Sequence, residues 1–251
     1  MSPNHSFELC LRMGDNGLIL GQRLAEWCGH GPILEQDIAL TNISLDLIGQ
    51  ARLWLSLAGQ IEGQGRDEDK LAYFRDANEF RHLNLCEQPN GHWGTTILRQ
   101  FLFDAFHLPL LEQISKFDDP QLASIAQKCV KEVRYHLRWS SEWAVRLGDG
   151  TEESHEKMQQ ALADVWPFAG EAILANAFDL ELAEINPAYN IQMVNKAWWS
   201  TVNDVFNQAN LEVPAANWAP QKGREGIHTE RLGFILAEMQ FLPRAYPDAQ
   251  W

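Results

Sequence analysis

Residues 34–59 read LEQDIALTNISLDLIGQARLWLSLAG, with polar side chains spread between apolar ones. Ile38, Leu45, Ile48 and Leu55 recur in this stretch at spacings of three or seven residues. This is the period of a helix that is buried on one face. We therefore predict one helix over the whole stretch, with these four side chains on its buried stripe.

The same period recurs along the rest of the chain, and no hairpin turn separates alternating apolar and polar runs. Further helices are predicted over about Phe7–Trp27, Lys70–Leu85, Trp93–Lys116, Pro120–Leu147, Glu153–Leu180, Ile191–Leu211 and Thr229–Ala245. The run 14–17 (GDNG) predicts a kink in the first of them. No linker is long or polar enough to force two domains. The sequence thus predicts an all-α helical bundle that forms a single domain over residues 1–251.

Composition excludes several classes of function. Among 251 residues, 34 are acidic and 20 are basic, for a net charge of −14. This charge argues against nucleic acid as a partner, because phosphate binding needs a basic face. No apolar run approaches the roughly 20 residues that span a bilayer. The four scattered cysteines form no C-x-x-C pair, so we expect free thiols in a reducing cytoplasm.

Helical bundles can hold two irons between carboxylates and imidazoles. In such bundles, two helices each supply one carboxylate, and two others each supply a Glu-x-x-His pair whose spacing puts both side chains on one face. Three such pairs occur here: Glu79–His82, Glu152–His155 and Glu225–His228. The first pair lies on a short predicted helix just before a Pro-Asn-Gly turn, and the second lies at the start of a predicted helix. The third spans Gly226 in a loop, so none of the three is well placed to bind a metal. A metal-binding enzyme that uses one of these pairs is the alternative hypothesis.

Several short motifs, taken together, carry a family resemblance. They are EWCGH at 26–30, LDLIGQAR at 45–52, EQPNG at 87–91, KEVRYHLR at 131–138 and AEMQ at 237–240. As a set they resemble the C subunits of the bacterial ring-1,2-phenylacetyl-CoA epoxidases, over nearly the whole chain. The resemblance implies a ferritin-like fold with additional helices. It also implies a companion A subunit of the same fold that holds a di-iron centre.

The resemblance aligns two iron-ligand helices of that catalytic subunit with this chain. One reads Glu-Ala-Gly-His there, and Leu47 and Gln50 stand here in place of the glutamate and the histidine. The other reads Glu-x-Phe-His there, and here Val133 replaces the glutamate while His136 remains. Aliphatic side chains offer a metal no lone pair, so we expect a degenerate di-iron site and no cofactor in this chain.

Two acids, Glu26 and Asp104, match the helices that supply single carboxylates in the catalytic subunit. If both are buried, each needs a charged or hydrogen-bonding partner. Glu132 lies four residues before His136, which leaves open a mononuclear site. The other interpretation of His136 is a hydrogen-bonded histidine in the core or at an interface.

Two further sets of residues have a functional and a structural interpretation. Lys222 and Arg224 stand among glycines and could contact the phosphates of coenzyme A, or they could belong to a solvated loop. Trp198, Trp199 and Trp251 are candidate interface residues, since tryptophan is enriched where proteins dock, and the structural interpretation is bulky core filler.

The resemblance implies a non-catalytic structural subunit of a multicomponent monooxygenase in aerobic phenylacetate catabolism. The complex would epoxidise phenylacetyl-CoA with O2 and electrons from NADPH. This chain would dock on the di-iron A subunit and stabilise it, contact other epoxidase subunits, and form a homodimer when alone. A helical scaffold unrelated to oxygenases is the third hypothesis, and it predicts no co-purification with a di-iron partner.

Overall fold

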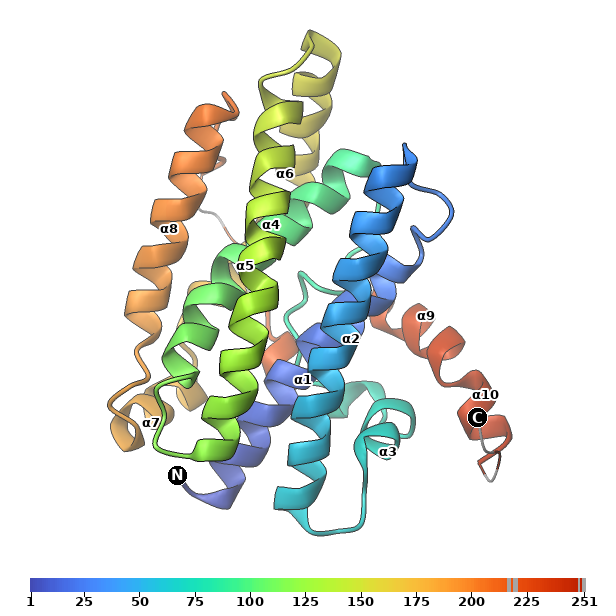
Figure 1. Cartoon of the computed structure of the whole chain (residues 1–251), viewed down its shortest axis with the longest axis vertical. Helices are drawn as coiled ribbons and strands as arrows, with labels where there is room; N and C mark the ends of the chain where they lie inside the picture. Colours follow the sequence, from blue (N-terminus) through green and yellow to red (C-terminus); the bar gives the residue numbers. More distant parts are fainter. Residues whose placement is uncertain (216–217, 219–220, 248, 250–251) are drawn as a thin grey trace. The chain divides into compact units, whose positions relative to one another are not determined.

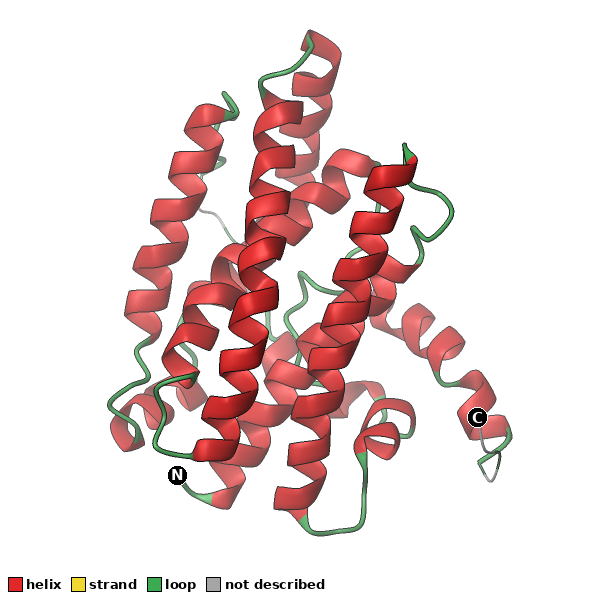
Figure 2. Ribbon diagram, in the orientation of Figure 1, coloured by secondary structure: helices red, strands yellow, loops and turns green. Residues whose placement is uncertain are grey.

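The computed structural model describes residues 1–215, 218, 221–247 and 249. Every regular element in these residues is a helix, and Figure 2 draws no strand there; Lys222 and Ile227 form one isolated bridge. The chain divides into two compact units, Met1–Pro89 with Lys222–Trp251, and Asn90–Gln221. The all-helical prediction is confirmed. Whether residues 1–251 fold as one domain stays a prediction.

The first unit combines the N-terminal helices with the C-terminal segment. Its elements are α1 (Pro3–Ala25), α2 (Leu34–Glu62), α3 (Glu68–Tyr73), η1 (Ala77–Glu79), η2 (Gly223–Glu225), α9 (Glu230–Met239) and α10 (Phe241–Ala245). Helices α1 and α2 pack along one another over much of their length (Figure 1). The unit therefore joins two segments that are far apart in the sequence.

Glycines allow α1 and α2 to approach closely. Helix α1 continues without a break through residues 14–17, and the kink predicted there stays a prediction. A Cβ at Gly17 would lie 2.8 Å from the backbone oxygen of Leu47, and one at Gly14 would lie 2.8 Å from the Leu55 side chain. These glycines are retained in a helix because a side chain would separate α1 from α2.

The predicted buried stripe on α2 is only partly correct. Leu55 is buried and Ile48 is half-buried, but Ile38 is 52% exposed and Leu45 is 61% exposed. Leu47 is fully buried instead. Helix α2 is thus apolar on two faces, and the face that carries Ile38 and Leu45 is open to solvent.

The predicted helix over Lys70–Leu85 is wrong beyond Tyr73. After α3 and η1, the chain runs through residues 80–85 without regular structure, although these residues are largely buried. The backbone N–H of Arg81 donates to Asp15 Oδ2 at 2.8 Å, and that of Leu83 donates to Asn16 Oδ1 at 2.8 Å. Polar side chains of α1 therefore satisfy the backbone groups that a helix would have paired internally.

The described residues of the second unit form five helices. They are α4 (Trp93–Ile114), α5 (Pro120–Gly148), α6 (Glu152–Ile173), α7 (Ala177–Ile185) and α8 (Ile191–Gln208). Helix α4 contacts α5, α6 and α8, and almost every residue from Gly94 to Leu111 is buried. It is the central helix of this unit, as expected for a helix that is apolar around most of its circumference.

The predicted helix over Glu153–Leu180 is two helices. Helix α6 ends at Ile173, and α7 starts after Asn176, whose side chain accepts from Asp179 N while Asp179 accepts from Asn176 N. This reciprocal capping starts a new helix at that point. The C-terminal segment is similarly divided at Gln240, between α9 and α10.

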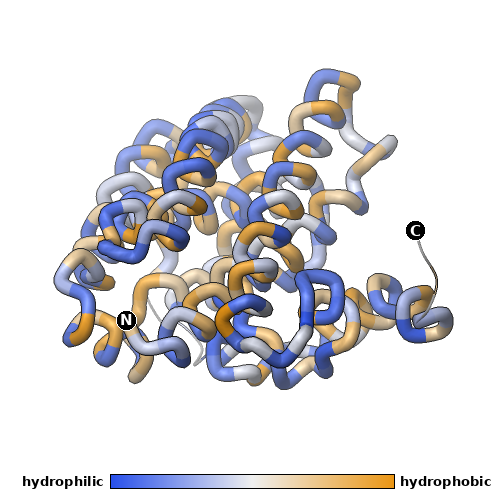
Figure 3. The backbone as a smooth tube through the Cα atoms, turned by 60° about the horizontal axis from the view of Figure 1, so that its bottom comes forward, coloured by the Kyte–Doolittle hydropathy of each residue, from blue (hydrophilic) through white to orange (hydrophobic). Residues whose placement is uncertain are grey.

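Hydrophilic and hydrophobic residues alternate along the helices in both units (Figure 3). Among the described residues, every helix is too short or too polar to cross a membrane.

Candidate functional site

The first unit carries one pair of the positions that the family resemblance aligns with iron ligands. Leu47 is fully buried in α2, and Gln50 is 2% exposed. Gly17 of α1 lies close to the backbone oxygen of Leu47. The Leu47 side chain has no atom that can ligate a metal, so this position supplies no bridging carboxylate.

The second unit carries the other pair, on α5. Val133 and His136 are both fully buried. Asp104, on α4, is also fully buried, as expected for a retained acid. Glu26 is not such an acid: its side chain is 43% exposed at the end of α1, where it pairs with Arg23 at 2.8 Å. The expectation that Glu26 belongs to the interior is therefore corrected.

Neutral hydrogen-bond donors surround Asp104. Gln100 Nε2 donates to its Oδ1 at 2.7 Å, and Ser140 Oγ donates to its Oδ2 at 2.8 Å. Burial raises the pKa of Asp104 to about 7, although the charge of His136 and the two hydrogen bonds oppose this rise. The carboxyl is therefore half protonated near neutral pH and can give or take a proton.

His107 belongs to the same region and was not among the residues predicted from the sequence. It lies one helical turn after Asp104 on α4 and is 2% exposed. Neither of its ring nitrogens has a hydrogen-bond partner among the described residues. Burial, followed by repulsion from His136, lowers its pKa to about 3, so the ring is neutral. A search for aspartate as well as glutamate three residues before histidine would have found it.

These residues do not fit a di-iron centre. In the described part of the chain, only His82, Glu87 and His228 form a group of three or more potential ligands whose donor atoms lie within 4.8 Å of one another. Asp104, His107 and His136 do not meet this criterion, and Leu47 and Val133 supply no donor.

Glu132 and His136 do not make a three-ligand site either. Glu132 is half-buried on α5, and the described residues bring no third ligand to the pair. The full burial of His136 near Asp104 favours the interpretation as a core histidine. A mononuclear site there stays an untested alternative.

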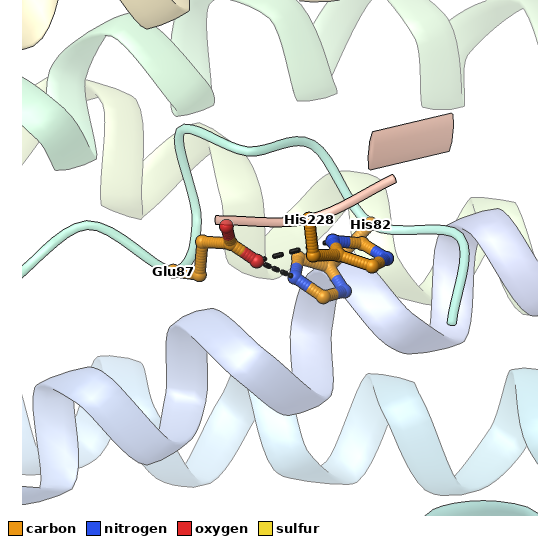
Figure 4. A group of neighbouring side chains, drawn as sticks. All are labelled: His82, Glu87 and His228. Carbon is orange, nitrogen blue, oxygen red and sulfur yellow. Dashed lines mark hydrogen bonds and ion pairs between the residues drawn. The ribbon is translucent and has the colours of Figure 1, made fainter. Parts of the chain in front are cut away.

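Glu87 is the centre of a second buried polar group, in the first unit (Figure 4). His82 Nε2 lies 2.8 Å and His228 Nδ1 lies 3.1 Å from the same oxygen, Glu87 Oε2. The backbone N–H of Thr229 donates to the other oxygen at 2.6 Å. The Arg23 guanidinium donates to the backbone oxygen of Glu87 at 2.9 and 3.1 Å. Glu87 thereby links α1, the segment after η1 and the start of α9.

Both ring nitrogens of His228 face acceptors, because its Nε2 lies 3.1 Å from the backbone oxygen of Phe80. Burial lowers the pKa of His82, so this ring is neutral and donates to Glu87 through Nε2. Burial raises the pKa of Glu87, but the bonds from His228, His82 and Thr229 outweigh it and lower that pKa to about 2.

The same group fits a metal ion poorly. The rings of His82 and His228 are stacked, with centroids 4.2 Å apart and planes only 17° from parallel. A metal lies about 2.0–2.1 Å from a ligating nitrogen, along its in-plane lone pair. Two nearly parallel planes at this separation cannot both contain one ion. The group is a hydrogen-bonded link, and the alternative hypothesis of a Glu-x-x-His metal enzyme gains no support from it.

We expect Glu87→Gln to lower the free energy of unfolding at pH 7 by about 2 kcal/mol, because it turns an amide N–H toward buried donors. Since the pKa of Glu87 is lowered, its contribution is complete above pH 4.5 and is lost as pH falls toward 2. The variant should therefore lose less stability than the wild type over that window. Urea unfolding at several pH values measures both effects, with the exposed Glu153→Gln as control.

The three Glu-x-x-His pairs that the sequence contains have other partners in the structure, as their poor placement in the sequence suggested. Glu79 accepts from Asp76 N, and Glu225 lies 3.8 Å from Lys222 Nζ, so His82 and His228 meet Glu87 instead. His155 Nδ1 lies 2.8 Å from the backbone oxygen of Gly148. Glu152 is exposed in the first turn of α6.

The candidate coenzyme A contacts differ in accessibility. Lys222 is exposed and pairs with Glu225, whereas Arg224 is only 7% exposed. Burial of Arg224 counts against a contact between its guanidinium and a ligand. The interpretation as an exposed, solvated loop is also wrong at Arg224.

The three candidate interface tryptophans have different outcomes. Trp198 is fully buried and donates from Nε1 to the Leu102 oxygen at 3.0 Å, so it is a core residue of the second unit and not an interface anchor. Trp199 is half-buried and packs edge-on against Trp198, with centroids 4.9 Å apart. Trp251 lies outside the described residues.

Comparison with known proteins gives the family. The family model described as "Phenylacetic acid catabolic protein", whose fold is ferritin-like and helical, matches residues 2–251. The chain is 49% identical over 241 residues to the C subunit of the 1,2-phenylacetyl-CoA epoxidase of Escherichia coli (strain K12). The match covers 96% of this chain and 97% of that relative. This chain belongs to the phenylacetic acid catabolic protein family.

Proposed function

We propose that this chain is a non-catalytic structural subunit of a phenylacetyl-CoA epoxidase that serves aerobic phenylacetate catabolism. It would dock on the catalytic A subunit, which holds the di-iron centre, and stabilise it. The observation that carries this proposal is the burial of Leu47 and Val133 at the positions aligned with iron-bridging glutamates. An iron pair there would lack two of its anionic ligands inside the protein, where uncompensated charge is costly.

Metal analysis tests the non-catalytic role. The chain is purified alone and together with the co-expressed A subunit, and iron is measured per chain. We expect iron only in the co-purified complex. A stoichiometric pair of irons in the chain purified alone would overturn the proposal.

The exposed face of α2 supports docking. Leu34, Ile38 and Leu45 are 72%, 52% and 61% exposed on one helix. Grouped apolar side chains on a protein surface are typical of interaction sites. We infer that this face contacts the A subunit, within an interface that should exceed about 2,000 Å² if it is obligate.

Charged substitutions test this docking face. We expect Ile38→Asp combined with Leu45→Asp to weaken co-purification with the A subunit at least about tenfold, because two apolar anchors are lost. The fold should persist, since both side chains are exposed. The matched control is Leu180→Asp with Met193→Asp, which changes equally exposed residues of α7 and α8. Equal loss of binding in both pairs of variants would refute the assignment to α2.

The expected location follows from the cysteines. Cys10, Cys28, Cys86 and Cys129 are all free thiols, and three of them are buried. This is consistent with a reducing cytoplasm, where we expect the complex to assemble.

A further inference from the structure

A basic hollow lies on the second unit, between the end of α4 and the first half of α5. Its volume is about 720 Å³, and Lys116, Lys128, Lys131 and Arg134 are four of its lining residues. The chain as a whole has 34 acidic and 20 basic residues. Glu112 is the only carboxylate among the described residues that line the hollow. The local sign of charge is therefore opposite to that of the whole protein.

Most of this positive charge is uncompensated. Arg134 pairs with Glu112 at 2.8 Å. Among the described residues, no carboxylate lies within ion-pair distance of the ammonium groups of Lys116, Lys128 or Lys131. Two lysines outside the hollow do form ion pairs: Lys157 pairs with Glu153, and Lys222 with Glu225. Three like charges facing one hollow repel each other, and an anion between them would relieve that repulsion.

The spacing of the cations fits a compact polyanion. Lys128, Lys131 and Arg134 follow one another every three residues, so they lie along one face of α5. Ser124 and Gln127 add uncharged donors to the same hollow. Val130 is the one apolar residue among the described lining residues, so polar and charged side chains dominate the hollow.

We propose that this hollow binds clustered phosphate groups, such as the diphosphate of a nucleotide. Lysine ammonium groups bind phosphate as mobile point charges and can converge from several sides. The volume of the hollow lies in the range of small-ligand sites. The proposal goes beyond the proposed function and does not depend on it.

Titration calorimetry with the full chain tests the proposal, with ADP, coenzyme A and tripolyphosphate as probes and adenosine as the uncharged control. We expect all three phosphates to bind and adenosine not to bind. Affinity should fall at least about tenfold between 0.05 and 0.5 M salt, because screening weakens exposed charges. Tighter binding of coenzyme A and ADP than of tripolyphosphate would assign the site to a nucleotide, and the reverse order to free polyphosphate.

Substitution locates the site. Lys128→Gln with Lys131→Gln should weaken phosphate binding about tenfold or more, since two of the charges in the hollow are removed. The control, Lys157→Gln with Lys196→Gln, makes the same change of net charge on exposed positions of α6 and α8 and should bind as the wild type does. Equal weakening in both variants, or no binding of any phosphate, would overturn the proposal. If the wild type binds no phosphate and the first variant loses binding to the A subunit, the hollow contacts an acidic protein surface instead.

Discussion

Arg75→Met should lower the free energy of unfolding by about 3–5 kcal/mol, because it leaves the buried Asp15 carboxylate without its counter-charge. Arg75 is 2% exposed and Asp15 is fully buried. The guanidinium contacts both carboxylate oxygens, and its Nη1 lies 3.0 Å from Asp15 Oδ2. It also donates to the backbone oxygens of Leu71 and Glu79. Methionine fills a similar volume but replaces none of these bonds.

Urea unfolding followed by circular dichroism measures this loss. The control is Arg52→Met on α2. Arg52 also pairs with a carboxylate, that of Glu68, but its side chain is 75% exposed. Exposed pairs contribute about 0–1 kcal/mol, so this variant should unfold nearly as the wild type does. A loss for Arg75→Met no larger than that for Arg52→Met would show that the buried pair of Asp15 and Arg75 stabilises the fold no more than an exposed pair does.

Asp15 also shows why the sequence predicted the helices better than the segments between them. Helix starts such as Asp119 before Pro120 are local signals, and Asp119 accepts from Gln121 N and Leu122 N as expected. The chain after Tyr73 has helical composition, but Asp15 and Asn16, 66 and 67 residues earlier, bind its backbone. A local pattern cannot reveal such a distant partner.

The two faces of α2 show a second limit of prediction from sequence, which concerns the choice of buried residues. Its apolar residues do not form one stripe, so periodicity alone could not decide which of them face the core. Leu47 and Leu55 are buried, while Leu45 is exposed. An exposed apolar face has the same helical period as a buried face. Only the packing of α2 against α1 distinguishes the two.

The polar groups were predictable in part. The family resemblance identifies Asp104 as a candidate acid, and it includes Glu87 only as part of a motif. Nothing local connects Glu87 to His228, which lies 141 residues later. His107 was missed because only glutamate was considered as the partner of a histidine one turn away. The sequence gives the chemical type of each side chain directly, whereas the pairing of distant residues depends on the fold.

Asp104→Asn should make the protein more stable than the wild type at pH 8, by about 3 kcal/mol. The pKa of Asp104 is raised from 3.8 to about 7, first of all by burial. A carboxyl with a raised pKa contributes stability that is complete below pH 3.8 and is lost as pH rises through 7. Asparagine is uncharged at every pH, so the variant should not share this loss.

The hydrogen bonds around Asp104 make asparagine a good mimic of the protonated acid. Ser140 Oγ also lies 3.3 Å from the backbone oxygen of Leu137, so it can donate there and accept from an N–H or O–H at position 104. Gln100 Nε2 still donates to the remaining oxygen. The two proteins should therefore have similar stability near pH 4 and diverge as pH rises.

Urea unfolding between pH 4 and pH 8 measures the divergence. Asp204→Asn is the matched control, because Asp204 is an exposed aspartate on α8 of the same unit. The control should follow the wild type at every pH. If Asp104→Asn were instead less stable than the wild type at pH 8, Asp104 would be an ionised, well-compensated carboxylate. Asp104 would then be a buried charged group with a counter-ion. The interior of the second unit could in that case accommodate a charge, although Val133 stands at one of the aligned ligand positions.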